Sequence, residues 1–494
     1  MSQTIIKEPD ITEKGFATPD VAPNSAPDAA ERLGIEPVGR LLLRFSLPAI
    51  TGMLVNALYN IVDRIFVGRG VDEIALGGLS LVGPLMTINF AFTVLFGIGA
   101  ANMISIRLGQ NQKIEAENAL NHCFALLLST GLIFMFLGLI FLEPLLSILG
   151  AQEGSGALDY ARSYLRIILY GTPFMMIGFG MSHCTRAQGF PTITMIGMLI
   201  GAILNTILDP VFIFVFKWGV EGAAWATIFS QFASAVWLMS FVLGKKGVLR
   251  LRLKNFRPKI AIIFRIMSFG SAQFLLNFIM SGVQLLINMS LGWYGSASLG
   301  VENGGDIALS AMNIIGALSM FIMMPVFGIN QGAQPILGYN YGAKKFSRVL
   351  RTYLFAAGAA TIICIIGFFA GEFFTLFLVR LFAPNGSPVL LGFAVWAIRV
   401  YFIMLPFNGF QVVSSNFFIV TGRPRMSVFL TTLRQFIALI PCILIFGRIW
   451  GLYGIAVAAP VADGFSFILT GILISFEIRK LRKAILSENE NPAV

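Results

Sequence analysis

The chain has 494 residues, of which 56% are hydrophobic and only 12% are charged, and its mean hydropathy is +0.81. Apolar stretches of twenty or more residues recur along almost the whole length, which is typical of membrane-spanning helices. This composition excludes a soluble globular protein and predicts an all-α integral membrane protein. The net charge of +11 indicates no nucleic-acid partner, because no patch of interleaved basic and aromatic residues is present.

The first 40 residues differ from the rest of the chain. They are rich in Pro, Asp, Glu, Ala and Thr and contain few large apolar side chains. This composition predicts a disordered cytosolic tail over residues 1–40. The tail lacks the apolar core of a signal peptide, so we expect no cleavage there by a signal peptidase.

Twelve transmembrane helices are expected after the tail, six in each half of the chain. The predicted domains are an N-terminal six-helix lobe at 41–243, a basic cytosolic connector at 244–261, a C-terminal six-helix lobe at 262–478 and a cytosolic tail at 479–494. The predicted spans are 41–67, 75–105, 116–142, 159–186, 190–216, 219–243, 262–291, 305–337, 347–379, 389–420, 424–446 and 450–477.

The two halves repeat one another. Gly189-Phe190-Pro191 recurs as Gly422-Arg423-Pro424, and Trp218-Gly219 recurs as Trp450-Gly451. Because six is an even number, both halves enter the membrane the same way up, and their pseudo-symmetry axis should run along the membrane normal. A parallel repeat of two pseudo-symmetric lobes predicts a transporter, since lobes that rock against each other can expose a shared site to either side.

Basic residues predict the orientation of the chain. With the N-terminus inside, the cytosolic side receives the basic connector and the Lys344–Arg351 and Arg479–Lys483 clusters. The outer loops keep only scattered basic residues. This bias places both termini in the cytosol of a multi-pass protein, which we expect in a bacterial cytoplasmic (inner) membrane.

The first predicted helix carries a polar stripe. Asn56, Tyr59, Asn60 and Asp63 fall at i, i+3, i+4 and i+7, so they share one face that should point into the bundle. A carboxylate in the membrane costs at least about 2.5–3.5 kcal/mol and therefore calls for a function or a partner. Asp63 could instead pair with Arg64 or Arg69 at a helix end.

The fifth predicted helix carries a second polar face. Asn205 and Asp209 lie one turn apart, and Pro210 should distort the helix beside the acid by removing a hydrogen bond. Thr227 of the sixth helix could add a hydroxyl. A distorted helix with free carbonyls beside an acid is a candidate Na⁺ or proton site, although Asp209 could also be a structural acid.

The second half repeats these faces without their acids. Asn277, Ser281 and Gln284 align with the first-helix stripe and are expected, with it, to line a polar cavity. We therefore expect ion coupling only in the N-terminal lobe. Other intramembrane polar residues have structural explanations: Asp463 can pair with Arg434 or Arg399, and His122 and His183 can be packing or interfacial groups. Cys123, Cys184, Cys364 and Cys442 lack metal-ligand spacing and are expected to be buried apolar residues.

No phosphate-binding loop, catalytic triad or H-E-x-x-H motif is present, so we expect no enzyme activity and no cofactor. Uphill transport would then draw on an ion gradient.

Several motifs together resemble the MATE (multidrug and toxic compound extrusion) family and its MepA-like branch. The resemblance spans residues 38–480 and rests on LYNIVDRIFVG at 58–68, ALGGLS at 75–80, RAQG at 186–189, GAAWAT at 222–227, QGAQPI at 331–336 and YNYGA at 339–343.

The resemblance implies a twelve-helix, two-lobed exporter of organic, often cationic, drugs in antiport with Na⁺ or H⁺. It implies a cation site in the N-lobe, which maps here onto Asp63, Asn205, Asp209 and Thr227. A polar fourth-helix Asn of some members is Ser182 here, and Gln284 replaces an acid that others use in the C-lobe. The expected partners are small-molecule drugs and the lipid bilayer, and the expected state is a monomer.

Two other functions fit a twelve-helix chain. A flippase for lipid-linked precursors should have a larger and more basic central cavity to accept phosphates, whereas the basic residues of this chain cluster in the predicted cytosolic loops. A membrane receptor or scaffold without transport would not need duplicated lobes or intramembrane acids.

Overall fold

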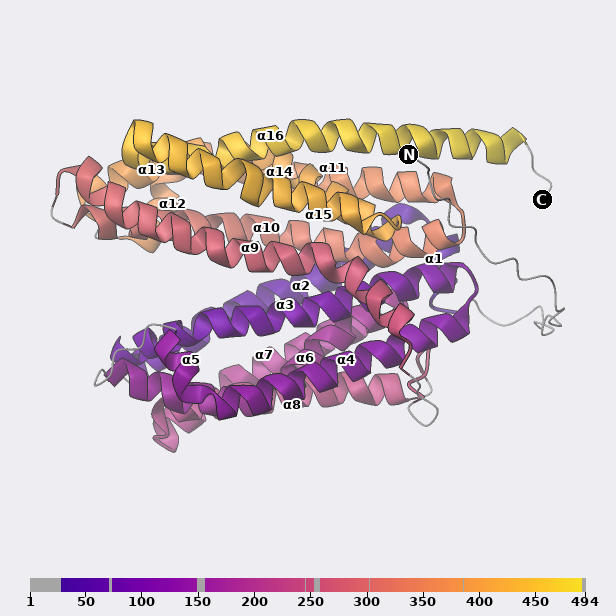
Figure 1. Ribbon diagram of the computed structural model, residues 1–494, viewed down its shortest axis with the longest axis horizontal. Coiled ribbons are helices and arrows are strands. Elements are labelled where there is room, and N and C mark those ends of the chain that lie inside the picture. The colour runs from indigo at the N-terminus through magenta and orange to yellow at the C-terminus, as the bar shows by residue number, and fades with distance from the viewer. Residues whose placement is uncertain are drawn as a thin grey trace, which may run out of the picture.

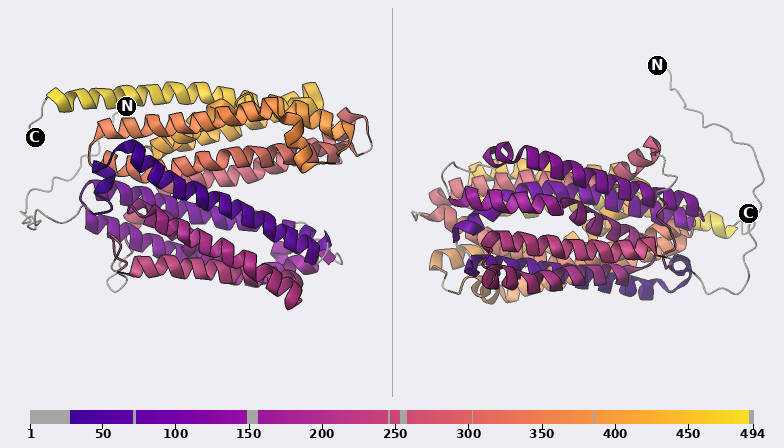
Figure 2. Two further views of the ribbon diagram at one scale, coloured as in Figure 1. Left: turned by 180° about the vertical axis from the view of Figure 1, so that it is seen from behind. Right: turned by 90° about the horizontal axis from the view of Figure 1, so that it is seen from below.

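A computed structural model describes residues 28–70, 73–148, 156–244, 246–252, 258–301, 303–384 and 386–490, and these residues fold into helices and connecting turns. Two helical lobes lie side by side, the N-terminal lobe in indigo to magenta and the C-terminal lobe in salmon to yellow (Figure 1). The lobes meet most closely at the end that carries α1 and diverge toward the end that carries α5 (Figures 1 and 2). We call the first of these the α1 end.

The N-terminal lobe is built on α3 and α6, which pack against each other and against α4. Its other pair, α2 and α7, packs beside α8. The bounds are α1 Arg32–Ile35, α2 Val38–Gly70, α3 Glu73–Gly109, α4 Lys113–Ile140, α5 Leu142–Ile148, α6 Gly156–Ala187, α7 Pro191–Pro210, the π-helix η1 Val211–Val215 and α8 Gly219–Leu243.

The C-terminal lobe packs α10 and α14 against α11, and α15 and α16 against α9. The bounds are α9 Ile260–Leu299, α10 Gly304–Gly342, α11 Phe346–Phe373, α12 Thr375–Phe382, α13 Pro388–Phe402, α14 Leu405–Val420, α15 Pro424–Thr432, the π-helix η2 Leu433–Leu439 and α16 Ile440–Glu490.

The predicted twelve spans are recovered in these helices. Among the described residues ten helices are long and apolar enough to cross a membrane, and α13 with α14, bent by 47°, makes an eleventh. The last of the ten, Pro424–Ser487, covers two predicted spans. Gly451 interrupts it near the junction of these spans, with φ 58° and ψ −133°. Glycine adopts this conformation without steric cost. The segment before Gly451 therefore folds back, and η2 packs against α16.

The predicted disordered tail is too long. Residues 28–40 contain α1 and the start of α2, and Leu33 is completely buried in the same apolar cluster as the helices of both lobes. Composition averaged over 40 residues concealed the few apolar side chains that dock this segment. The predicted tail residues 1–27 lie outside the described part of the chain.

Candidate cation site and the seam between the lobes

The fifth predicted helix, α7, buries the polar pair that the sequence singles out. Asn205 and Asp209 are 1% and 0% exposed. The amide of Asn205 donates hydrogen bonds to Oδ1 of Asp209 at 3.2 Å and to Oγ1 of Thr227 on α8 at 3.5 Å. The chain changes from α- to π-helical winding directly after Pro210, at Val211. The expected distortion beside the acid is therefore present, in the form that often marks functional sites.

Asp63 reaches the same group from α2, which packs against α7. Its half-buried carboxyl lies close enough to that of Asp209 for the two acids to interact electrostatically. Two neighbouring carboxylates repel each other when both are ionised, and this repulsion favours uptake of a proton or a cation. All four predicted coupling residues are thus brought together. The alternative partners Arg64 and Arg69 have side chains outside the described ones.

Two oxygen atoms in this group have no hydrogen-bond donor among the described residues. They are Oδ1 of Asn205 and Oδ2 of Asp209, and both are buried. A buried oxygen without a donor is costly and rare in folded proteins. A carboxylate, an amide oxygen and a hydroxyl are also the oxygen ligands that a hard cation prefers. The group could therefore hold Na⁺ or a proton.

The rest of the first-helix stripe is only partly described. Asn56 and Tyr59 are half-buried on α2, and each interacts with another residue. The side chain of Asn60 lies outside the described ones. That Asn56, Tyr59 and Asn60 line a polar cavity accordingly remains a prediction.

The matching residues of the C-terminal lobe bond within their own helix, α9. Asn277 donates to the carbonyl of Gln273 at 2.8 Å, Ser281 to the carbonyl of Asn277 at 3.1 Å, and Gln284 to Asn288 at 2.9 Å. The side chain of Gln284 is exposed on the surface of α9. None of these hydrogen bonds, among the described residues, involves an acid, in line with the predicted loss of charge from this half.

Asp463 is held by a structural pair, as one of the two alternatives predicted. Nε of Arg434 donates to Oδ1 of Asp463 at 2.6 Å, and both side chains are largely buried. Arg399, the other candidate partner, lies 3.9 Å from Glu372 instead.

The predicted packing residues serve structural contacts. Nδ1 of His122 lies 2.7 Å from the carbonyl of Asn118, and Nε2 accepts a hydrogen bond from the backbone of Lys259. His122 thereby fixes the connector between the lobes. His183 is buried beside the ring of Phe179. The four cysteines are free thiols, three of them buried and Cys442 half-buried.

A seam between the lobes closes the α1 end, and the sequence reasoning did not predict it. Gln334 of α10 donates to Asn102 of α3 at 2.7 Å, and Arg186 of α6 donates to Gln331 of α10 at 2.5 Å. Around these bonds the helices touch at glycines: a Cβ on Gly109 would collide with the backbone of Tyr339, and one on Gly342 with that of Ile106. The signal in the sequence was the pair of glutamines inside an apolar span.

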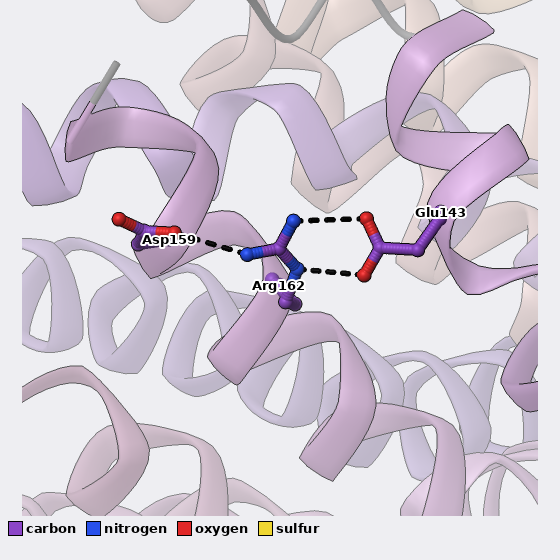
Figure 3. A network of polar contacts seen from close by, with 3 residues as sticks. All are labelled: Glu143, Asp159 and Arg162. Carbon is purple, nitrogen blue, oxygen red and sulfur yellow. Dashed lines mark hydrogen bonds and ion pairs between the residues drawn. The ribbon is translucent and has the colours of Figure 1, made fainter. Parts of the chain in front are cut away.

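The opposite end of the N-terminal lobe carries α5 (Figure 1), and an exposed ionic cluster lies there, drawn from close by in Figure 3. Arg162 of α6 donates to both carboxylate oxygens of Glu143 on α5, at 2.7 and 2.9 Å, and to Asp159 at 3.0 Å. The hydrogen bond from Arg162 holds the pKa of Glu143 below its ordinary value. The cluster ties the short helix α5 to α6.

Comparisons with known proteins agree with this architecture. The chain is 27% identical over 446 residues to the multidrug export protein MepA of Staphylococcus aureus (strain MRSA252), covering 90% of this chain and 94% of that protein. It is 25% identical over 441 residues to MepA of Staphylococcus saprophyticus, covering 89% and 93%.

Solved structures share the fold. One described as the outward-facing conformation of a multidrug resistance MATE family transporter matches with a TM-score of 0.85 at 24% identity, over 93% of this chain and 100% of that one. A MOP superfamily transporter from Pyrococcus furiosus, whose binding pocket is described as reversed in polarity, matches with a TM-score of 0.84 at 25% identity over the same shares. The sequence model of the MatE family matches residues 48–211 and 273–444, one segment in each lobe and together more than half of the chain. The chain belongs to the MatE family.

Proposed function

We propose that this protein is a secondary active multidrug efflux transporter, which exports organic and often cationic compounds in antiport with Na⁺ or H⁺. The observation that carries the coupling proposal is the buried group around Asn205 and Asp209, with its two acceptor oxygens that lack a donor among the described residues. The relatives named multidrug export proteins support the choice of cargo. No cofactor is required, and the working unit is a monomer in a bacterial cytoplasmic membrane.

The coupling ion acts by changing the charge of the N-terminal lobe. Na⁺ or a proton taken up by Asp63 and Asp209 neutralises their repulsion and alters how α2 packs against α7. The ion drives transport only if it binds one conformation more tightly than the other, since equal affinity shifts no population. One elementary charge moving inward across 100 mV supplies about 2.3 kcal/mol, which is roughly fiftyfold in concentration.

The orientation follows the basic residues. With both termini in the cytosol, the α1 end is the cytosolic end, and the seam of Gln334 with Asn102 and Arg186 with Gln331 acts as the cytosolic gate. Alternating access then requires this seam to part while the opposite end closes. Small residues and the neutral amides of Asn102, Gln331 and Gln334 suit an interface that must separate, because water can replace each of their hydrogen bonds.

The test is efflux of ethidium from proteoliposomes with Na⁺ and pH gradients imposed separately. Asp63→Asn and Asp209→Asn should each abolish ion-driven efflux without lowering expression. Asp306→Asn, at the exposed start of α10, is the matched control and should transport normally. Normal efflux from both site variants would remove the coupling assignment, and no gradient-dependent efflux from the parent would remove the function itself.

A further inference from the structure

The chain before the first transmembrane helix folds back across the seam. Residues 28–37, which we call the clasp, contain α1 and lead directly into α2 of the N-terminal lobe. Ala30 and Leu33 of the clasp are 4% and 0% exposed and belong to the apolar cluster shared by both lobes. A segment outside the membrane spans is therefore buried as deeply as the helices that it covers.

The C-terminal lobe holds the clasp by its backbone carbonyls. Arg348 of α11 donates to the carbonyls of Leu33 at 3.1 Å, Glu36 at 2.6 Å and Ile35 at 3.5 Å. These carbonyls lie at the end of a short helix, where the backbone has no intrahelical donor and favours a cation.

Two further donors from the same lobe complete this contact. Asn340 of α10 donates to the carbonyl of Leu33 at 2.9 Å, and Lys345 donates to the carbonyl of Gly34 at 3.0 Å. Asn340 also accepts a hydrogen bond from Nε of Arg348 at 3.0 Å, so the donors orient one another. The side chain of Tyr339 fills the space where a Cβ on Gly34 would lie.

The other end of the clasp rests on the N-terminal lobe. A Cβ on Gly189, in the turn between α6 and α7, would lie 2.6 Å from the carbonyl oxygen of Ala29. Gly189 also has φ 100°, a backbone conformation that favours glycine over residues with a side chain. The absence of a side chain at this position lets the backbone of Ala29 approach closely. Asp28 and Arg32 border a cavity of about 290 Å³ with Phe45 and Phe190 of the same lobe.

We propose that the clasp is a latch across the two lobes, which stabilises the closed seam and must release from Arg348, Asn340 and Lys345 whenever the α1 end opens. The clasp is covalently joined to the N-terminal lobe, whereas its hydrogen-bond donors belong to the C-terminal lobe. Separation of the lobes at this end therefore breaks these bonds or pulls Ala29 from Gly189. An interaction made in only one of two conformations shifts the population toward that conformation.

The latch is tested by the accessibility of a thiol placed in the seam. Ser105 of α3 is 1% exposed and faces Gly338 of α10, so Ser105→Cys reports when the lobes separate. The measurement is the rate of labelling by a polar maleimide in nanodiscs, which needs neither substrate nor ion gradient and so remains valid if the proposed coupling fails. The background chain has alanine in place of Cys123, Cys184, Cys364 and Cys442.

Arg348→Ala removes the donor of three carbonyls, and Leu33→Glu places a charge in the buried face of the clasp. Each should raise the labelling rate about tenfold, as expected when the closed state loses roughly 1.4 kcal/mol of stabilisation. Arg348→Lys, which retains the charge but lacks the fork, should give an intermediate rate. The matched control is Arg351→Ala, one turn along α11 on an exposed residue.

Unchanged rates in Arg348→Ala and Leu33→Glu would overturn the proposal. An equal increase in Arg351→Ala would also overturn it, because the effect would then come from the basic charge of α11 and not from the clasp. An increase in only one of the two clasp variants would likewise contradict a latch, since each weakens the docking of the clasp, one at its hydrogen bonds and the other at its buried apolar face.

Discussion

Nδ2 of Asn205 donates a 3.2 Å hydrogen bond to Oδ1 of Asp209, one turn further along α7, while Oδ1 of Asn205 and Oδ2 of Asp209 lack a donor among the described residues. The pair thus presents two acceptor oxygens and a single internal bond in a fully buried position. A cation that binds there gains ligands that are already oriented, and the helix need not rearrange its backbone.

The Asn205 amide should therefore control the affinity for the coupling ion. Asn205→Leu removes one oxygen ligand and the bond that orients Asp209, and a hydrogen bond to a charged group contributes about 1.5–3 kcal/mol. We expect the ion concentration for half-maximal efflux to rise roughly ten- to a hundredfold. Thr206→Val is the control, because the hydroxyl of Thr206 donates to the carbonyl of Ala202 and not to the site.

Thr227 should distinguish the two candidate ions. Na⁺ needs several oxygen ligands, whereas a proton needs only a carboxylate, so removal of the hydroxyl weakens Na⁺ coupling alone. If Na⁺ is the coupling ion, Thr227→Ala should raise its half-maximal concentration about tenfold and Thr227→Ser should restore it. Equal pH-driven efflux from the parent, Thr227→Ala and Thr227→Ser would instead identify H⁺.

Asp463 should affect stability and leave coupling intact. Asp463→Asn leaves Arg434 without its carboxylate, and breaking a buried pair costs about 3–5 kcal/mol. Arg434 is 31% exposed, so we expect roughly 2–3 kcal/mol, which is below that range because solvent screens the pair. Thermal unfolding in detergent measures the loss. The exposed pair of Arg399 and Glu372 provides the control, and Arg399→Gln should change stability little. Loss of ion dependence in folded Asp463→Asn would contradict a structural role.

Closure of the seam should depend on Gly342. A methyl group there would meet the backbone of Ile106, which cannot rotate away as a side chain could. Overpacking of this kind costs about 1–3 kcal/mol, so Gly342→Ala should favour separated lobes at the α1 end and reduce efflux. Gly358→Ala on α11, where no atom lies within 4 Å of the added group, should transport normally. Full activity of Gly342→Ala would show that the seam need not close this tightly.

The Glu143–Arg162 pair should respond to acid. Because the folded-state pKa of Glu143 is lowered, the pair stabilises the fold above the ordinary glutamate pKa of about 4.3 and loses that effect as pH falls through the folded-state value. Glu143→Gln should therefore unfold at a lower temperature than the parent at pH 7. The difference should shrink as pH falls below about 4.3 and vanish only below the folded-state pKa of Glu143. A difference that persists in acid would have to come from packing of α5.

The amino-acid sequence alone predicted the membrane class, the duplicated lobes and the four residues of the candidate site. Asp63, Asn205, Asp209 and Thr227 could be identified because a polar side chain in an apolar helix is costly, so each one stands out against its surroundings. Helix periodicity then assigned Asn205 and Asp209 to one face before any contact was known. The left-handed turn at Gly451, near the start of the last predicted span, was by contrast not predicted.

Tertiary structure alone decided how the lobes meet and what covers their junction. Asn102 and Gln334 lie far apart in the chain, and only packing brings them within 2.7 Å. The clasp was hidden for a different reason: its donors contact backbone carbonyls, which every residue carries and no sequence pattern marks. Intrahelical periodicity is written in the order of residues, whereas contacts between distant segments depend on shape complementarity that appears only when both surfaces have folded.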